Sequence, residues 1–350
     1  MRAEDHVVIK NIYYMMTYAF KALKFKQYSK LQTEDFETID DLMAAILAIG
    51  LSTQRKRGFE REYQPRCEWL HDIRGRIDMA DTARLKMGGS NEISCVYDDL
   101  SADTYKNRIL KTTARLLIDK PGVDTARRHD LKRCLIGMGD VQFADVRRVD
   151  WARLRFDRNN ASYQLLMNVC RMVLERQLLT QSQGTRKMSE YDSQRQLSNL
   201  YEKFVLKYYQ QRFAGEQGMT IRAKEINRRI ESDEPTFLPT LQTDVTLHQG
   251  DKTLIIDTKC YGQILQAHFN GKIYRPKHIN QIQSYVLHEA YGNDDEVSGM
   301  LLYALTDNDN EHDETWRELG HRFSVRTLDL GQNFRDITAE LNDIVERWMR

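Results

Sequence analysis

Three side chains in the C-terminal half of the sequence have the types and spacing for metal-assisted chemistry: Asp244, Asp257 and Lys259. Asp257 and Lys259 are two residues apart, so on a strand they project from the same face. The apolar run Leu254-Ile255-Ile256 just before them predicts a strand that is seated in a core. Gln249-Gly250-Asp251 predicts a compact hairpin turn, which brings Asp244 back toward Asp257. We therefore expect two carboxylates and a lysine to converge at the end of a buried strand.

Phosphodiester hydrolysis needs this set of groups. Carboxylate oxygens bind one or two magnesium ions that neutralise the scissile phosphate, and a lysine orients the attacking water. The D-x-K triplet is short, however, and the alternative is that Asp257 and Lys259 form only an ion pair. The sequence thus indicates a metal-dependent nuclease, with a purely structural ion pair as the competing interpretation.

A basic, acid-free segment follows the triplet. Between Lys259 and Tyr285 there is no Asp or Glu, and the cations other than Lys259 are Lys272, Arg275 and Lys277. A phosphate backbone could lie along such a segment, and a solvated surface is the alternative. Because the whole chain has 52 basic and 51 acidic residues, any binding of nucleic acid must come from local segregation of charge of this kind.

Hydrophobic periodicity predicts the elements that position these groups. In the C-terminal half we expect a long helix with an apolar stripe from Leu197 to Tyr208, followed by elements in the order strand, strand, strand, helix, strand. The predicted ranges are strands at 221–230, 243–247 and 253–258, a helix at 279–290 and a strand at 300–305, then a strand at 323–330 and a closing helix at 333–349. The polar run 180–187 is predicted to be a loop.

The first part of the chain mixes helices and hairpins. Residues 11–20 are apolar nearly all round and predict a buried helix, residues 55–100 combine β-favouring pieces with turn signals, and residues 107–118 return to helical spacing. We expect an α+β N-terminal domain at 1–160 and a second domain at 161–350.

Other classes of protein are excluded by what the sequence lacks. There is no G-x-x-x-x-G-K-[ST] segment, so the chain should not hydrolyse nucleotides by itself. The five cysteines are far apart with no C-x-x-C pair, which favours free thiols over a zinc or redox site. The longest uncharged stretch, 42–54, is too short for a membrane span of about 20 residues, and Glu4 and Asp5 lie where a secretory signal is positive. We therefore expect a cytoplasmic protein that has no membrane association.

The C-terminal pattern resembles the PD-(D/E)xK nuclease superfamily. Asp244 and Asp257-Thr258-Lys259 match its acidic and lysine positions, although Thr243 replaces the eponymous proline. Gln281 and Tyr285 match the Q-x-x-x-Y often found on its second core helix. The resemblance implies an α/β restriction-endonuclease-like domain with a mixed central sheet, in which Gln281 and Tyr285 support the site.

The same resemblance gives Glu202 a possible accessory role. Glu202 falls on the first core helix, where many superfamily members carry another acid that contacts metal or water. The alternative for Glu202 is a solvent-facing helix acid.

Segments along the rest of the chain resemble the McrC family, the nuclease subunits of McrBC modification-dependent (type IV) restriction systems. The resemblance rests on three segments: Ile9 to Ala19, Ile73 to Asp78, and Thr104 to Lys111. It implies an endonuclease subunit that uses Mg²⁺ on Asp244 and Asp257. It also implies a partner, the McrB AAA+ GTPase hexamer, which binds the GTP and recognises modified cytosine in double-stranded DNA.

The family resemblance has further implications. The N-terminal domain would stimulate GTP hydrolysis by the ring, with residues 55–100 as the inserted element and Arg74 and Arg76 pressing on ring subunits. A double-strand break would need a second copy of the complex, because one such site cuts one strand. Two alternatives stay open: a nuclease of the same superfamily that serves another partner, and a non-catalytic adaptor that activates the ring and only binds DNA.

Overall fold

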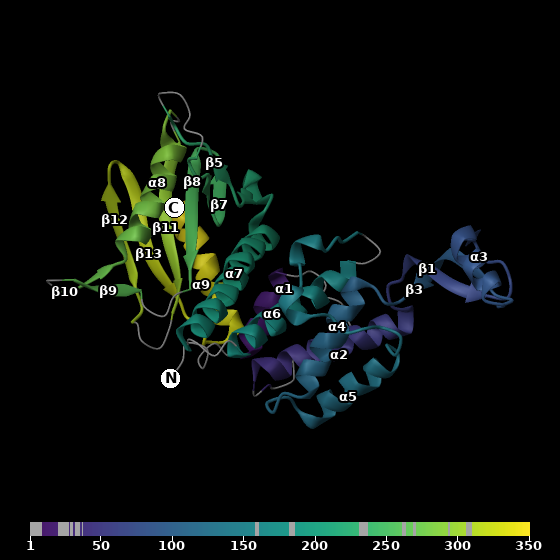
Figure 1. Ribbon diagram of the computed structural model, residues 1–350. Coiled ribbons are helices and arrows are strands. Elements are labelled where there is room, and N and C mark those ends of the chain that lie inside the picture. Colours follow the sequence, from purple (N-terminus) through teal and green to yellow (C-terminus); the bar gives the residue numbers. More distant parts are fainter. Residues whose placement is uncertain are drawn as a thin grey trace. The chain divides into compact units, whose positions relative to one another are not determined.

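The computed structural model describes most of the chain in two compact units (Figure 1). The described residues are 9–19, 28, 31, 36, 38–157, 161–181, 186–230, 237–260, 264–268, 271–292, 295–305 and 310–350. By their contacts, residues 36–181 form one unit, and residues 182–350 together with the N-terminal helix form the other. None of the helices in the described part of the chain is long and apolar enough to span a bilayer.

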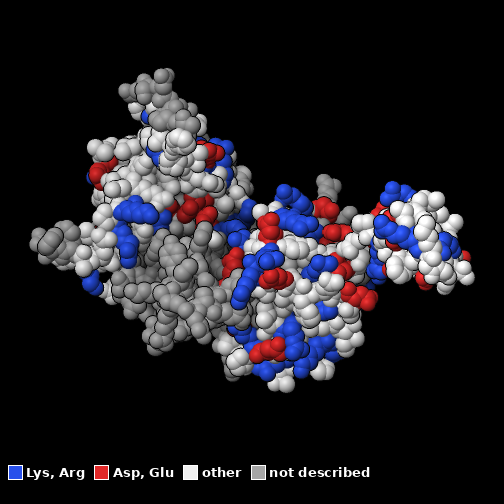
Figure 2. All heavy atoms as spheres, viewed as in Figure 1, with Lys and Arg blue, Asp and Glu red and all other residues white. Residues whose placement is uncertain are grey.

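The unit of residues 36–181 is built on four helices. They are α2 (Ile39–Arg57), α4 (Tyr105–Ile118), α5 (Thr125–Ile136) and α6 (Ala161–Gln181), and α2 packs against the other three. Thr38 caps the start of helix α2, because its hydroxyl accepts a hydrogen bond from the Asp41 N–H. Figure 2 shows Lys and Arg side chains interspersed with Asp and Glu over the surface of this unit.

A small sheet extends from these helices. The β1–β3 extension consists of β1 (Glu62–Leu70), β2 (Arg76–Ile77), α3 (Met79–Met87) and β3 (Ile93–Ser101), with antiparallel strand order β1-β3-β2. Gly75 allows the turn into β2, because its φ is +70° and a Cβ there would lie 2.5 Å from the Val96 carbonyl oxygen. The antiparallel pairing predicted for residues 55–100 is confirmed, whereas helix α3 within this range was not predicted.

The second unit is built on a mixed six-stranded sheet of order β12-β13-β11-β8-β7-β4. Its strands are β4 (Thr220–Arg222), β7 (Val245–Gln249), β8 (Lys252–Lys259), β11 (Glu296–Ala304), β12 (Asp313–Glu318) and β13 (His321–Leu328). Strands β8, β11 and β13 run parallel, and the other neighbours are antiparallel. Because parallel neighbours need a crossover, α8 (Pro276–Ala290) connects β8 to β11.

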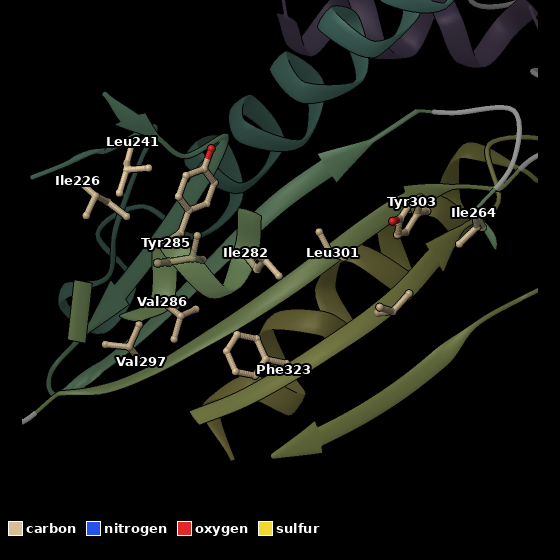
Figure 3. Packing of buried hydrophobic residues seen from close by; sticks show 12 residues of the cluster. Ile226, Leu241, Ile264, Ile282, Tyr285, Val286, Val297, Leu301, Tyr303 and Phe323 are labelled. Atoms are coloured by element: carbon tan, nitrogen blue, oxygen red, sulfur yellow. The ribbon is translucent and has the colours of Figure 1, made fainter. Parts of the chain in front are cut away.

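Helix α8 covers one face of this sheet through a hydrophobic cluster (Figure 3). Ile282, Tyr285 and Val286 of α8 belong to one buried cluster with Leu301 of β11 and Phe323 of β13. Gly299 of β11 makes this close approach possible, since a Cβ there would lie 2.8 Å from both Ile282 and Val286.

Three more helices complete the unit: α1 (Ile9–Ala19), α7 (Arg186–Phe213) and α9 (Phe334–Met349). The Tyr209 hydroxyl of α7 donates to the Leu341 carbonyl of α9, which fixes these two helices together. Helix α1 joins them through the Tyr14 ring, which stacks on Phe334 at 4.6 Å, and through Asn11, which donates to the Leu330 carbonyl at 2.7 Å.

The structure differs from the sequence predictions in three places. The sequence put the domain boundary near residue 160, but α6 packs with the preceding helices and α1 packs with the C-terminal unit. The single strand predicted at 221–230 is wrong: β4 ends at Arg222, and a separate two-stranded sheet forms from β5 (Glu225–Ile226) and β6 (Leu241–Gln242). The chain leaves the main sheet there because the backbone N–H of Lys224 donates to the Thr243 hydroxyl and the Lys224 carbonyl accepts from the Thr243 N–H.

The third difference is a set of strands that were not predicted. Strand β12 lies in an acidic run, and a ribbon of β9 (Leu265–His268) and β10 (Gly271–Tyr274) follows β8. Part of the loop predicted at 180–187 lies outside the described residues; α6 extends to Gln181 and α7 begins at Arg186.

Candidate active site

The β7–β8 hairpin brings the two candidate carboxylates together. Val245 pairs with Ile256, and Gln249 pairs with Lys252 across a two-residue connection in which Gly250 has a φ of +61°. One step further along the same register puts Asp244 opposite Asp257. The Asp244 carboxylate is held there because its Oδ2 accepts hydrogen bonds from the Thr258 N–H (2.7 Å) and the Thr258 hydroxyl (2.8 Å).

Asp257 and Lys259 form a buried ion pair. Lys259 Nζ lies 2.5 Å from Asp257 Oδ2, and the two residues are 8% and 1% exposed, respectively. Burial raises the pKa of Asp257 to about 6, although the neighbouring Lys259 charge opposes this rise and Asp244 adds to it. The two-residue spacing on β8 therefore has the predicted consequence that both side chains lie on the same face.

Helix α8 also contacts Lys259. The lysine Nζ donates to Gln281 Oε1 at 3.2 Å, and Gln281 Nε2 donates to the Tyr285 hydroxyl at 2.8 Å. Tyr285 is only 6% exposed and belongs to the cluster under α8. Gln281 is thus fixed by a residue anchored in the core, and it holds the lysine in turn.

Glu202 of α7 lies in the field of the two aspartates. Burial raises the pKa of Glu202 to about 7, and the negative charges of Asp244 and, more weakly, Asp257 add to the rise. Glu202 is partly buried rather than solvent-facing. A third acid therefore lies near enough to interact electrostatically with the pair, although the three do not form a metal-binding cluster of protein ligands.

The predicted DNA-binding cations lie around the start of α8. Lys272 is exposed on β10, Arg275 immediately precedes α8, and Lys277 is exposed in its first turn. Two of these cations, Arg275 and Lys277, act on His278, whose pKa is lowered to about 4 by burial and then by the charges of Lys259, Arg275 and Lys277. The sequence did not single out His278, which is buried and shares a hydrogen bond of 2.8 Å with the Tyr303 hydroxyl.

The donor set fits a magnesium ion. Among the described residues there is no cluster of three or more acids, histidines or cysteines that could hold a metal by protein ligands alone. Mg²⁺ is commonly held by one or two carboxylates and takes its remaining ligands from water and substrate phosphate. Asp244 and Asp257 supply two hard oxygen donors, and a cation beside Asp257 would offset the unfavourable burial of its charge.

Comparison with known proteins supplies the family. The family model described as McrBC 5-methylcytosine restriction system component matches residues 2–304. The chain belongs to this family. It is also 24% identical over 345 residues to the type IV methyl-directed restriction enzyme EcoKMcrBC of Escherichia coli K12, covering 98% of this chain and 99% of that protein. The resemblance of the sequence to the McrC family is thereby confirmed.

The fold of this McrBC family member is shared with a solved structure. A chain in the refined half-complex from the tetradecameric assembly of Thermococcus gammatolerans McrB AAA+ hexamers with bound McrC matches it with a TM-score of 0.55. The identity is 14%, and the match covers 96% of this chain and 76% of that chain.

The two family-like segments of the first unit have different structural roles. In the β1–β3 extension, Arg74 lies over the Tyr97 ring at 3.9 Å and pairs with Asp99 at 3.5 Å, whereas Arg76 is exposed on β2. The segment Thr104 to Lys111 contacts the chain just before the extension and stabilises its base. There Lys106 pairs with Glu60 at 2.8 Å in a nearly buried site. The two arginines are therefore not equivalent.

Proposed function

We propose that this chain is the endonuclease subunit of a modification-dependent restriction complex, with a PD-(D/E)xK active site that hydrolyses DNA phosphodiester bonds using Mg²⁺. The observation that carries the proposal is the convergence of Asp244, Asp257 and Lys259 at one edge of the mixed sheet. Along the chain, helix α7 is followed by strands β7 and β8, and these are followed by α8 and β11. This order of elements agrees with that of the superfamily.

The residues divide the work by their chemistry. Asp244 and Asp257 would hold the metal ion, which when bound supplies positive charge to a scissile phosphate. Lys259 would orient the attacking water, because Asp257 and Gln281 fix its ammonium group from two sides. The fixed ammonium reduces the reorganisation needed as charge develops at phosphorus. Glu202 would act as an accessory contact to metal or water, because its carboxyl interacts electrostatically with both aspartates.

We propose that the partner is an McrB-type AAA+ hexamer, because the solved relative is such a hexamer with bound McrC. The partner would bind GTP and recognise modified cytosine, since this chain has no phosphate-binding loop sequence. Lys272, Arg275 and Lys277 would contact DNA, and two complexes would meet for a double-strand break. Such a complex would work in the cytoplasm.

Cleavage of plasmid DNA tests the site. Methylated and unmethylated plasmid are incubated with this protein, its cognate McrB, Mg²⁺ and GTP. The Asp257→Ala variant should lose cleavage by roughly a thousandfold or more, because the site can no longer offset charge at the phosphate. It should still stimulate GTP hydrolysis.

The matched control is Asp251→Ala, which removes an exposed acid from the turn of the same hairpin. It should cleave like the unaltered protein. If Asp257→Ala cuts equally well, the catalytic assignment is wrong.

A second candidate is a non-catalytic adaptor that activates the ring and binds DNA. It is favoured by the Asp257–Lys259 ion pair, in which the two charges can satisfy each other structurally. The same experiment separates the two functions: an adaptor gives no cleavage with either protein while GTP hydrolysis still rises.

Stimulation of the partner tests the β1–β3 extension. Arg76→Ala should weaken the interface by about 1–2 kcal/mol, which raises the concentration needed for half-maximal GTP hydrolysis roughly 5- to 30-fold. The control is Arg84→Ala, an exposed arginine of α3 in the same extension. Arg74 is engaged within the extension by Tyr97 and Asp99. Arg74→Ala should therefore change stimulation only indirectly, by destabilising the fold of the extension. An unchanged hydrolysis profile for Arg76→Ala would count against this surface.

A further inference from the structure

The β9–β10 ribbon stands apart from the main sheet. Among the described residues, strands β9 and β10 pair with each other and with no other strand, with His268 opposite Gly271 and Leu265 opposite Tyr274. Figure 1 shows the ribbon projecting beside the strands of the sheet. A two-stranded ribbon alone is marginally stable in water, so this one depends on what holds its base and on what it contacts.

The base of the ribbon is fixed to the core. Ile264, the residue before β9, is fully buried in the cluster under α8. Tyr274, the last residue of β10, packs against the same cluster, and its hydroxyl shares a hydrogen bond of 3.1 Å with His312 Nδ1. At the other end, Ala267, Gly271 and Lys272 are exposed. The ribbon is therefore anchored at one end and open to solvent at the other.

The topology puts this base at the edge of the sheet that carries the carboxylates. Strands β8 and β11 run parallel and end at this edge, β8 with Lys259 and β11 opposite it with Tyr303. Five residues separate Lys259 from the start of the ribbon, and one residue, Arg275, separates the end of the ribbon from α8. His312, which holds Tyr274, comes just before β12 where that strand pairs with the end of β13.

Charge along the ribbon and α8 favours an anionic partner. The sequence from Lys259 to His288 has no Asp or Glu, a stretch that includes the whole ribbon and most of α8. Lys272 is exposed on the ribbon, and Arg275 and Lys277 lie at its junction with α8. The whole chain, by contrast, has nearly equal numbers of basic and acidic residues, 52 and 51.

We propose that the β9–β10 ribbon enters the major groove of the DNA duplex next to the phosphate that is cleaved. The inference rests on the proposed nuclease function and adds how the duplex is held. Four residues per strand give the ribbon a reach of roughly 13 Å. The major groove is about 12 Å wide and about 8.5 Å deep, and it admits a two-stranded ribbon.

One face of the ribbon suits a close approach to DNA. Ala267 and Lys272 are register partners, so their side chains project from the same face. The methyl group of Ala267 adds little bulk, which leaves the Lys272 ammonium free to reach a phosphate or a base edge. Arg275 and Lys277 at the base would bind the backbone phosphates on either side of the groove.

Site-directed photocrosslinking tests this placement. A benzophenone side chain is introduced at Ala267 in the full chain that also carries Asp257→Asn, so that bound DNA stays intact. The complex with cognate McrB and GTP is irradiated on methylated duplex DNA. We expect crosslinks to bases within a few positions of the cut made by the unaltered complex. The control is the same side chain at Leu319, which is exposed in the turn between β12 and β13.

Salt dependence gives a second readout. Each phosphate contact contributes about 0.9 to the slope of log affinity against log salt, so Lys272→Ala should reduce that slope by about 1. Lys132→Ala, an exposed lysine of α5, should leave it unchanged. Base crosslinks together with a reduced slope support the ribbon in the groove.

The other outcomes each overturn the inference. Crosslinks to the partner protein, crosslinks only to the sugar-phosphate backbone, or crosslinks at Leu319 as strong as at Ala267 all contradict a ribbon seated in the groove. Cleavage by the unaltered complex is measured in parallel. If that complex cuts and the ribbon tests fail, only the ribbon placement is wrong; if it does not cut, the proposed nuclease function fails first.

Discussion

The raised pKa of Glu202 makes a quantitative prediction about the carboxylate site. Burial, reinforced by Asp244, raises that pKa from 4.5 to about 7. At about 1.4 kcal/mol per pH unit this corresponds to roughly 3 kcal/mol against the ionised form. Because Glu202 is partly exposed, screening by water reduces the expected cost to about 1–2 kcal/mol. Glu202→Gln keeps the shape of the side chain and removes this cost.

The direction of the pH dependence follows from linkage. A carboxyl whose folded-state pKa is raised contributes stability that is fully present below its unfolded value, and this stability is lost as the pH rises to about 7. Glu202→Gln should therefore stabilise the site at pH 8 and have almost no effect near pH 4.5.

Hydrogen–deuterium exchange is the suitable assay, because a chain of two units does not unfold in one step. Variant and unaltered protein are compared at the same pH without divalent cations. At pH 8, amides of α7 and β8 should exchange roughly 5- to 30-fold more slowly in Glu202→Gln. The control is Glu216→Gln, an exposed acid after α7 that pairs with Arg212. An equal gain at both pH values, or no gain at pH 8, would refute the burial argument.

Magnesium extends the experiment to the accessory role of Glu202. If this carboxylate contacts the metal or its water, added Mg²⁺ should stabilise the unaltered protein more than Glu202→Gln and so close the gap at pH 8. A gap that Mg²⁺ leaves unchanged would remove Glu202 from the metal site.

Two further predictions concern how the site and the extension are supported. Gly299→Ala should cost about 1–3 kcal/mol through overpacking against Ile282 and Val286, which would show as faster exchange in α8 and slower cleavage; Gly139→Ala, with nothing within 4 Å, should change neither. Lys106→Met should lower stability by about 3 kcal/mol, because it leaves the nearly buried Glu60 without its cation; faster exchange in α4 measures this loss. Adding Glu60→Leu should restore most of the lost stability. A double variant as unstable as Lys106→Met would contradict this account.

Local signals in the sequence were sufficient for much of the second unit. The apolar run before Asp257, the short turn at Gly250 and the period of α8 each depend on neighbours within a few residues, and the structure agrees with all three. The same is true of the antiparallel pairing in the β1–β3 extension. Prediction failed where a tertiary hydrogen bond overrides the local preference for a strand. At Lys224, hydrogen bonds to Thr243 end a strand that the apolar pattern of the sequence would continue.

The sequence by itself determined the chemistry that is available: two carboxylates and a lysine on one hairpin, an acid-free basic segment after them, and family-like segments along the chain. Only the tertiary structure decided the environment of these groups. Lys259 meets Gln281 across 22 residues, and Asn11 reaches Leu330 across 319 residues, so neither contact leaves a periodic trace in the sequence. Burial of Asp257 and Glu202, which raises the pKa of each, likewise depends on elements distant in the chain. Residue types fix what a site can do, whereas packing between distant segments fixes the charges and positions with which it does it.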